Sequence, residues 1–460
     1  MAGPIQTVKF KSGFQTSSWS YGLKRLSGAA RIVLHNLPLA ARYLMGRLPK
    51  PVSFAPHAVG RDFFGLNVAA SPSKDIEDYH LARLVELGVS QVRTDYAYAS
   101  EPGPTERWID RLCAEGFTVL VHLVQPAQEA SRMDRKETQQ RWVGFLERVF
   151  RRFRGKVRCY EIGSTPNRHS WSGYSLSDYV TAFSLAQETA DRFGVELIGP
   201  NIQDFAPYFL AGVLGELRRA GVFLPLVTDN LFVDRAGQPE EYDVHVSRPL
   251  LHWVHRLDLA RKSWYLDLIA TANGMGPPVC TYVYWTVNPN PAKPRRRYVT
   301  EEQYANHLVR YFVNAAAAGH LRRVYWGQMS GFFKGIIDDG APLRFEPPAV
   351  FQRLLNAGSL DHYRLRPGFG AFRVMVERLA DTNFVRRLSA GRKDACVFEF
   401  EKQGKPFWVA WARNGHAADL GATIANQRIA RVVDRDGREV AASGPISLSE
   451  SPLYLYPAAI

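Results

Sequence analysis

From Asp62 onwards, short apolar runs alternate with longer amphipathic stretches, which is the pattern of repeated strand–helix units. The expected strands are Phe63–Val68, Ser90–Asp95, Thr118–Val124, Val157–Ile162, Glu196–Gly199, Leu226–Phe232, Val279–Trp285 and Val324–Met329. The helical runs between them are Asp75–Leu87, Glu106–Glu115, Thr138–Arg154, Leu176–Phe193, Tyr208–Ala220, Leu251–Ala272 and Thr300–Ala318. Such units over about 280 residues match the size of a closed barrel. The sequence therefore predicts an α/β fold with a (β/α)8 TIM barrel over residues 55–345.

After Pro347 the pattern changes from helical to alternating. A short helix is expected at Gly370–Leu379, and alternating segments follow at Ala395–Glu401, Pro406–Ala412, Ile429–Asp434 and Pro452–Tyr456. Turn-like residues separate them, including Asp436 and Gly437. These features predict a small C-terminal β-sandwich over residues 346–460.

Residues 1–54 form a third segment with a different pattern. Between Tyr21 and Leu48, apolar residues recur at spacings of three and four while basic residues fall on other faces, which predicts an amphipathic helix. Pro38 is expected to break or kink it. A basic amphipathic helix can lie in an anionic membrane interface, and the alternative is a helix packed on the barrel wall.

Charge reinforces the membrane alternative. The net charge is +14, and the first 60 residues hold eight Lys or Arg and no Asp or Glu. Such an imbalance indicates an acidic partner: a membrane surface, a phosphorylated glycan or nucleic acid. No recognisable nucleic-acid module supports the last of these.

Composition is that of a globular protein, with 46% hydrophobic and 22% charged residues. No apolar stretch reaches the roughly 18 residues of a membrane span. The four cysteines lie far apart without metal-ligand spacing, so reduced core thiols are expected, and neither a metal nor a cofactor is expected. An export signal is not recognised, so a cytoplasmic location is expected, with peripheral attachment to the inner membrane.

The segments Val92–Tyr96, Glu101–Gly103, Trp108–Asp110 and Glu115–Val121 resemble the second and third units of clan A glycoside hydrolases, above all the β-xylosidase and exopolysaccharide-hydrolase branches. The resemblance covers about residues 60–345, and the C-terminal segment is similar to the accessory domain of such enzymes. It implies the carboxylate pair of a retaining mechanism, with the acid/base at the carboxyl end of the fourth strand and the nucleophile at that of the seventh.

Both implied carboxylates are replaced in this sequence. The fourth strand continues as Glu-Ile-Gly-Ser-Thr-Pro-Asn over residues 161–167, so Thr165 occupies the acid/base position while Asn167 keeps its place in the frame. The seventh strand ends Thr-Tyr-Val-Tyr-Trp, which puts Tyr282 at the nucleophile position. No Asp or Glu occurs between Asp267 and Glu301, so a shifted alignment does not restore the carboxylate. Threonine cannot act as a proton donor near neutral pH, and loss of hydrolysis is expected.

Other residues near the strand ends are candidates for binding. Glu161 has the parity of a deeper barrel layer and is expected to form a buried pair with Arg93, and the resemblance places Arg93 and Asp95 in the cleft floor. Asp204, Asp229 and Asp234 are potential helpers if Tyr282 acts as a nucleophile. Aromatic residues expected to line the cleft or the core are Tyr96, Tyr98, Trp171, Phe232, Tyr284, Trp285 and Trp326. Gln328 matches a sugar-site position of the family.

Two basic segments complete the candidates. The loop after the seventh strand carries Arg295, Arg296 and Arg297, whose guanidinium groups suit phosphate or carboxylate oxygens, although a solvated loop without a ligand is equally compatible. A second run, Arg148 to Arg158, precedes the fourth strand and either extends a membrane-facing surface or is a solvated helix end.

The expected function is therefore a catalytically degenerate, glycoside-hydrolase-like protein that binds an oligo- or polysaccharide in bacterial cell-envelope polysaccharide or lipopolysaccharide metabolism. The glycan is expected to be acidic or phosphorylated. The alternative is an active glycoside hydrolase or transglycosidase with rearranged catalytic residues.

Overall fold

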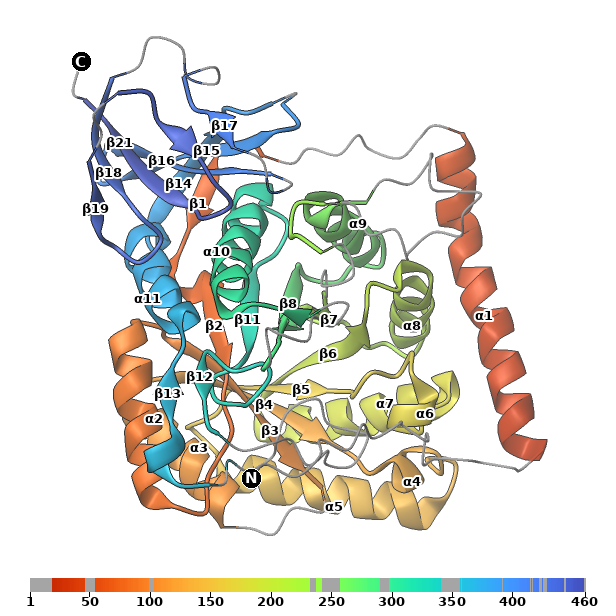
Figure 1. Cartoon of the computed structure of the whole chain (residues 1–460). Coiled ribbons are helices and arrows are strands. Elements are labelled where there is room, and N and C mark those ends of the chain that lie inside the picture. Colours follow the sequence, from red (N-terminus) through yellow and green to blue (C-terminus); the bar gives the residue numbers. More distant parts are fainter. Residues whose placement is uncertain are drawn as a thin grey trace.

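The computed structural model describes residues 19–45, 54–98, 103–231, 237–241, 257–289, 298–340, 356, 358–390, 392–413, 415, 417–421, 424, 428–441 and 444–458. A closed barrel of eight parallel strands forms its centre, in the order β11-β2-β3-β4-β5-β6-β7-β8 (Figure 1). The strands are β2 (Phe64–Asn67), β3 (Gln91–Ala97), β4 (Thr118–Val124), β5 (Cys159–Ile162), β6 (Glu196–Gln203), β7 (Val227–Asn230), β8 (Pro278–Val283) and β11 (Arg323–Gln328). Each predicted strand is present, which confirms the TIM barrel.

Helices surround the barrel. They are α2 (Lys74–Leu87), α3 (Pro104–Ala114), α4 (Ala127–Ala130), α5 (Lys136–Arg152), α6 (His169–Ser172), α7 (Leu176–Phe193), α8 (Pro207–Arg219), α9 (Leu259–Ala272), α10 (Glu301–Ala318) and α11 (Pro367–Leu379). The predicted start of α9 at Leu251 is corrected to Leu259, because the Asp258 side chain caps the backbone N–H of Arg261 and thereby fixes the first turn.

The barrel interior is filled from its amino-terminal end by apolar side chains. Leu120, Ile198, Val279 and Tyr325 form this inner layer, separate from the larger core between strands and helices. Polar side chains replace them towards the carboxyl ends of the strands. TIM barrels have their binding sites at the carboxyl ends of the strands, which is the polar end of this barrel interior.

The C-terminal region is built on a seven-stranded sheet in the order β1-β14-β15-β16-β21-β18-β19, with a two-stranded sheet, β17-β20, beside it. Its strands are β1 (His57–Val59), β14 (Thr382–Arg387), β15 (Ala395–Lys402), β16 (Lys405–Ala412), β17 (Ala418–Asp419), β18 (Ile429–Val433), β19 (Glu439–Val440), β20 (Ser447–Leu448) and β21 (Leu453–Pro457). One face, with Phe398 and Trp411, packs on the main core, and Trp408 on the other joins a second apolar cluster. This agrees with the predicted accessory β-sandwich.

The accessory domain is discontinuous in sequence. β1 precedes the barrel yet pairs antiparallel with β14, His57 lying opposite Phe384. The expected boundary at residue 55 assigns these residues to the barrel and therefore needs correction. Short elements complete the described structure: β9 (Thr286–Val287), β10 (Tyr298–Val299), β12 (Ile337–Asp338), β13 (Arg364–Leu365), and the 3-10 turns at Arg61–Phe63 and Leu360–His362.

Helix α1 (Trp19–Leu44) lies along the outside of the barrel beside α8 (Figure 1). It continues through Pro38, so the expected break at this residue is wrong. The predicted amphipathic helix is present, and it packs on the barrel wall. Among the described residues, no helix is long and apolar enough to cross a membrane.

Candidate functional site

A buried network of charged residues closes the floor of the barrel mouth. Arg93 on β3 donates through Nε to Oε2 of Glu161 on β5 at 2.7 Å and through a terminal nitrogen to Oδ1 of Asp95 at 3.0 Å. His122 on β4 places Nδ1 2.8 Å from the same Asp95 oxygen and Nε2 2.5 Å from the carbonyl oxygen of Gly163. The predicted Arg93–Glu161 pair is therefore present, and two carboxylates share one guanidinium.

Glu161 is further held by uncharged donors. Asn201 Nδ2 donates to its Oε1 at 2.8 Å, and Thr281 Oγ1 lies 3.2 Å from the same atom. Burial alone would raise the pKa of Glu161, but Arg93, His122 and hydrogen bonds from neighbouring side chains outweigh it and hold the pKa below its usual value. An ionised, fully buried carboxylate cannot protonate a leaving group, so Glu161 does not act as a displaced acid.

Thr165, at the expected acid/base position, is 1% exposed and has a φ of 51°. Its backbone N–H donates to the carbonyl oxygen of Asn201 at 3.1 Å, whereas its Oγ1 has no hydrogen-bond partner among the described residues. A β-branched residue in the left-handed region is strained, and such strain persists only where the surroundings impose it. The threonine thus occupies the frame without supplying a proton donor.

Tyr282, at the expected nucleophile position, is 1% exposed. Its ring centroid lies 5.4 Å from that of Tyr284 and 6.0 Å from Nζ of Lys334. Burial raises the pKa of Tyr282 well above its usual value, and the neighbouring Tyr284 and Asp95 raise it further. Because a tyrosine nucleophile must lose its proton, this environment opposes catalysis by Tyr282.

Two of the three candidate helpers, Asp204 and Asp229, lie in the described part of the chain, and their surroundings differ. Asp204 accepts a hydrogen bond from Arg168 at 2.8 Å, at the surface end of β6. Asp229 is fully buried, and its strand neighbours Thr228 and Asn230 are the ones that point into the barrel, where they bond to Asn201 and Thr281. Burial, reinforced by the charge of Asp204, raises the pKa of Asp229 well above its usual value. Asp229 is thus a buried group behind the barrel wall rather than part of an open cleft.

Several aromatic candidates belong to the core. The rings of Trp285 and Trp326 stack with centroids 6.0 Å apart, and Nε1 of Trp326 donates to the Tyr304 hydroxyl of α10 at 2.7 Å. Tyr96 donates to Glu106 at 2.9 Å on the helix side of β3. Trp285, Trp326 and Tyr96 are all buried, so they pack between strands and helices and do not line a cleft. Gln328 is also nearly covered, at 6% exposure.

Among the described residues, several side chains that follow the carboxyl ends of the barrel strands are half-buried rather than buried. They are Tyr98, Asn167, Trp171, Tyr284 and Lys334. Asn167 bridges to the end of β6, its Nδ2 donating to the carbonyl oxygen of Gln203 at 2.8 Å. Nζ of Lys334 lies 3.8 Å from the centre of the Tyr284 ring. The sequence reasoning missed Lys334, although its place between two glycines after the eighth barrel strand marks it as a loop residue.

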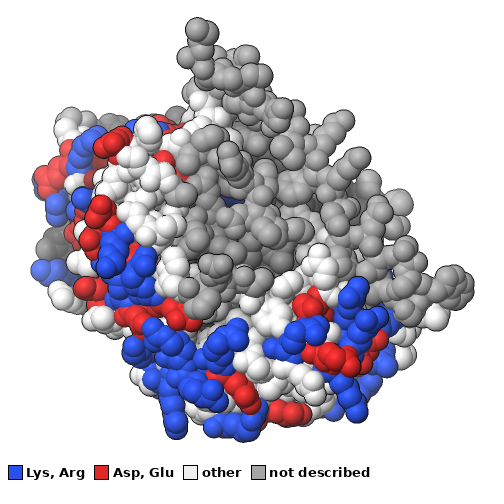
Figure 2. Space-filling view, turned by 90° about the horizontal axis from the view of Figure 1, so that it is seen from below, with Lys and Arg blue, Asp and Glu red and all other residues white. Residues whose placement is uncertain are grey.

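The two basic segments that the sequence indicates as binding surfaces differ in what the structure describes of them. Arg295, Arg296 and Arg297 lie outside the described residues, as do Phe232 and Asp234. In the run Arg148–Arg158, Lys156 donates to Asp110 at 2.6 Å and Arg152 pairs with both Asp110 and Glu106. Figure 2 shows blue and red side chains interleaved on this side of the molecule. The run is therefore partly balanced by acids.

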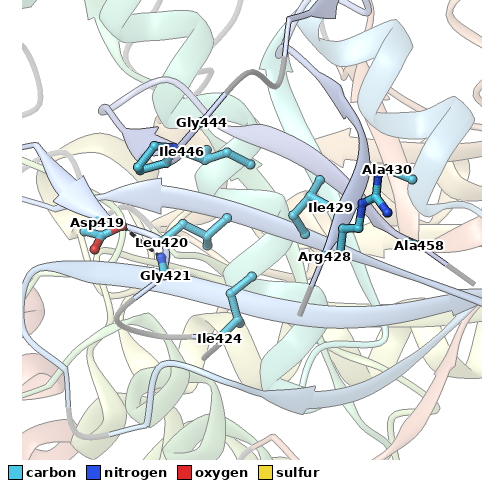
Figure 3. Close-up of a pocket in the computed structure, with 11 residues that line it drawn as sticks. Asp419, Leu420, Gly421, Ile424, Arg428, Ile429, Ala430, Gly444, Ile446 and Ala458 are labelled. Carbon is cyan, nitrogen blue, oxygen red and sulfur yellow. Dashed lines mark hydrogen bonds between the residues drawn. The ribbon is translucent and has the colours of Figure 1, made fainter. Parts of the chain in front are cut away.

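A hollow of about 1200 Å³ lies in the accessory domain, away from the mouth. Leu420, Ile424 and Ile446 point into it, and Asp419 and Arg428 lie at opposite ends, so its lining is polar as well as apolar (Figure 3). In the described part of the chain, no cluster of His, Cys, Asp or Glu is suited to a metal ion.

The eight-stranded barrel with its accessory sheet is the fold of the clan A glycoside hydrolases. The chain is similar to a family 39 glycoside hydrolase from Bacteroides cellulosilyticus WH2, with a TM-score of 0.64 and 15% identity over 88% of this chain and 83% of that one. It is also similar to the family 30 xylanase Xyn30A from Clostridium acetobutylicum, with a TM-score of 0.55 and 11% identity over 89% and 98%. A glucosidase from Croceicoccus marinus gives 0.53 and 13% over 89% and 98%. No family model and no curated protein sequence matches the chain.

Proposed function

We propose that this protein is a non-hydrolytic carbohydrate-binding barrel that acts in bacterial cell-envelope polysaccharide or lipopolysaccharide metabolism, in the cytoplasm and on the inner-membrane surface. One observation carries the loss of hydrolysis. Thr165 and Tyr282 occupy the two carboxylate positions, and the two acids of the barrel floor, Glu161 and Asp95, are both bound to Arg93. A glycosidase needs one free acid and one free base or nucleophile facing the substrate.

An acidic or phosphorylated glycan is the ligand that fits the remaining chemistry. Tyr284 is an aromatic side chain of the kind on which sugars stack, and Lys334, whose Nζ lies over its ring, is a cation of the kind that binds phosphate or carboxylate. The arginines 295–297 follow the strand that carries Tyr282, and guanidinium groups form strong charge-assisted hydrogen bonds with such oxygens.

Two measurements test the proposal. Purified protein should not hydrolyse aryl glycosides or envelope polysaccharides, and calorimetric titration should show tighter binding of a phosphorylated envelope oligosaccharide than of its dephosphorylated form. Replacing all three loop arginines by Ala should weaken binding of the phosphorylated form at least tenfold, since each charge-assisted bond contributes about 1.5–3 kcal/mol.

A matched control removes the same charge elsewhere. Arg148, Arg151 and Arg154 are exposed or nearly so on the opposite end of the barrel, and their triple Ala variant should bind as the wild type does. Turnover that disappears in an Asp204→Asn variant would instead establish a hydrolase with rearranged catalytic groups. Equal affinity for both oligosaccharides would refute the acidic-glycan part.

A further inference from the structure

Helix α1 presents its apolar stripe to solvent. Leu23, Leu26, Val33, Leu34, Leu37 and Met45 are between 53% and 70% exposed. They make up six of the eleven large apolar side chains that are exposed in the described part of the chain. We call these six residues the outer face of α1. At about 100° per residue, these six positions fall within an arc of about 120° around the helix axis, with Met45 directly after the last residue of α1, so they form one stripe along the helix.

The opposite face of α1 is fixed to the barrel by small and charged groups. A Cβ on Gly212 of α8 would lie 2.6 Å from Cγ1 of Ile32, and one on Gly28 would lie 3.2 Å from Cβ of Leu176, so glycine allows close approach at both points. Ile32 and Leu39 contact the core from this side. The helix is therefore seated on the barrel without using its main apolar stripe.

Ion pairs secure the same contact. Nζ of Lys24 lies 3.0 Å from Oδ1 of Asp178 on α7, and the His35 and Arg31 side chains reach Glu216 on α8 at 2.6 and 3.2 Å. Asp178 and Glu216 are only 2% and 5% exposed, so α1 supplies ionic partners to two covered acids, of which Glu216 also pairs with Arg219 of its own helix. An ordinary surface helix packs its main apolar stripe inwards. In α1 the outer face remains in water, while Lys24 and His35 turn towards acids of the barrel helices.

The charge of α1 and of the residues around it indicates what kind of surface would cover the outer face of α1. Residues 1–60 contain no acid and eight basic residues, and Arg25 and Arg42 of α1 are exposed on either side of the stripe. We propose that the outer face of α1 inserts into the interfacial region of an anionic lipid bilayer, with Arg25 and Arg42 directed to the lipid headgroups. This inference rests on the membrane location within the proposed function and does not depend on sugar binding.

The geometry suits an interfacial helix. Leu23 to Met45 spans about 33 Å at the 1.5 Å rise of an α-helix, which is long enough to lie in the plane of a membrane surface. Two copies of this chain meeting through the same face would bring like-charged Arg25 and Arg42 together. A single helical stripe also offers far fewer than the 20–30 residues per partner that a stable protein interface uses. A lipid surface brings no like charges together and does not require a large protein interface.

The test is co-sedimentation of full-length protein with vesicles of phosphatidylcholine alone or mixed with phosphatidylglycerol. Wild type should bind the anionic vesicles and bind phosphatidylcholine vesicles at least tenfold more weakly, and added salt should release it, because lipid charge is screened over a Debye length. The triple variant Leu26→Ser, Val33→Ser, Leu37→Ser should lose at least tenfold in binding. The double variant Arg25→Gln, Arg42→Gln should bind less and depend less on salt.

A matched control changes three exposed apolar residues outside α1. Val85, Phe223 and Val440 are 63%, 59% and 44% exposed, and their triple Ser variant should bind vesicles as the wild type does. Equal loss in both triple variants, or unchanged binding in the α1 variant, would overturn the proposal. So would a wild-type dimer in sedimentation equilibrium that the α1 substitutions convert to a monomer, because the second copy would then be the occupant.

Glycan titration of the same α1 variant separates the two proposals. Retained glycan affinity together with lost vesicle binding supports the membrane role of α1. Vesicle binding by a protein that binds no glycan would refute the proposed carbohydrate function and leave the membrane inference standing.

Discussion

Glu161 and Arg93 form a buried ion pair inside the barrel, with Oε2 of the carboxylate 2.7 Å from Nε of the guanidinium. The same guanidinium holds Asp95 at 3.0 Å, so one cation serves two carboxylates. These acids could be mistaken for a catalytic pair on grounds of proximity. Their exposed fractions of 0% and 4% and their shared partner give them a positioning role instead.

The first prediction concerns this pair. Replacing Glu161 by Gln should destabilise the fold by about 3–5 kcal/mol, because it leaves a buried guanidinium with less compensating charge. Urea unfolding followed by far-UV circular dichroism measures the change. Arg386→Gln, which breaks a surface pair with Glu399, is the control and should cost less than about 1 kcal/mol. A loss below 1 kcal/mol for Glu161→Gln would contradict the structural role.

The second prediction concerns pH and His80. Burial lowers the pKa of His80 to about 3, and its Nε2 lies 2.5 Å from Oγ of Ser330. Because the folded pKa lies below the unfolded value of about 6.5, the unfolded chain binds the proton first as pH falls. The stabilisation is therefore complete above about pH 6.5 and is lost towards pH 3, at up to about 1.4 kcal/mol per pH unit.

The variant His80→Gln tests this pH dependence, since Gln keeps a polar group near Ser330 but does not titrate. Its free energy of unfolding should fall less steeply than that of wild type between pH 6.5 and 4.5. His307, whose pKa burial also lowers to about 3, remains in both proteins and sets a common background. Parallel pH curves would show that His80 contributes no linkage.

The third prediction concerns the packing of α1 on α8. Gly212→Ala should force Ile32 away, because the added Cβ would lie 2.6 Å from Cγ1 and 3.0 Å from Cα of that residue. Overpacking of this kind costs about 1–3 kcal/mol. Hydrogen exchange of residues 22–42 should accelerate. Gly144→Ala, in α5 with nothing within 4 Å of the added atom, is the matched control and should stabilise the chain slightly.

Hydrophobic periodicity predicted every barrel strand and most helix ends, because buried parallel strands and amphipathic helices leave strong patterns. It did not decide whether Trp285 and Trp326 line the cleft or belong to the core. The ladder between β8 and β11 shifts register between Val324 and Trp326, so simple alternation does not tell which side of the barrel a residue faces there. Long-range polar contacts, such as that of Asn201 with Glu161, are likewise invisible in a local pattern.

The sequence pattern also did not predict which face of α1 packs on the barrel. Amphipathicity identifies two faces, but it does not determine which one packs. The packing face follows from Gly212 on another helix and from Glu216, whose carboxylate meets His35 at 2.6 Å. Two glycines three residues apart, at 212 and 215, are the only local signal that another helix approaches α8 closely.

The last prediction concerns the mouth of the barrel. Nζ of Lys334 lies 3.8 Å from the centre of the Tyr284 ring, so the cation and the aromatic surface form one unit on which an acidic sugar can rest. Lys334→Gln should weaken binding of a phosphorylated oligosaccharide about tenfold and leave the dephosphorylated form nearly unchanged, because only the charge is lost. Tyr284→Ala should weaken both, since stacking does not depend on the phosphate. Calorimetric titration gives the four affinities, and Tyr208→Ala, an exposed tyrosine on α8, is the control. If Lys334→Gln lowered the two affinities equally, the lysine would be acting through the position of Tyr284 rather than on the phosphate.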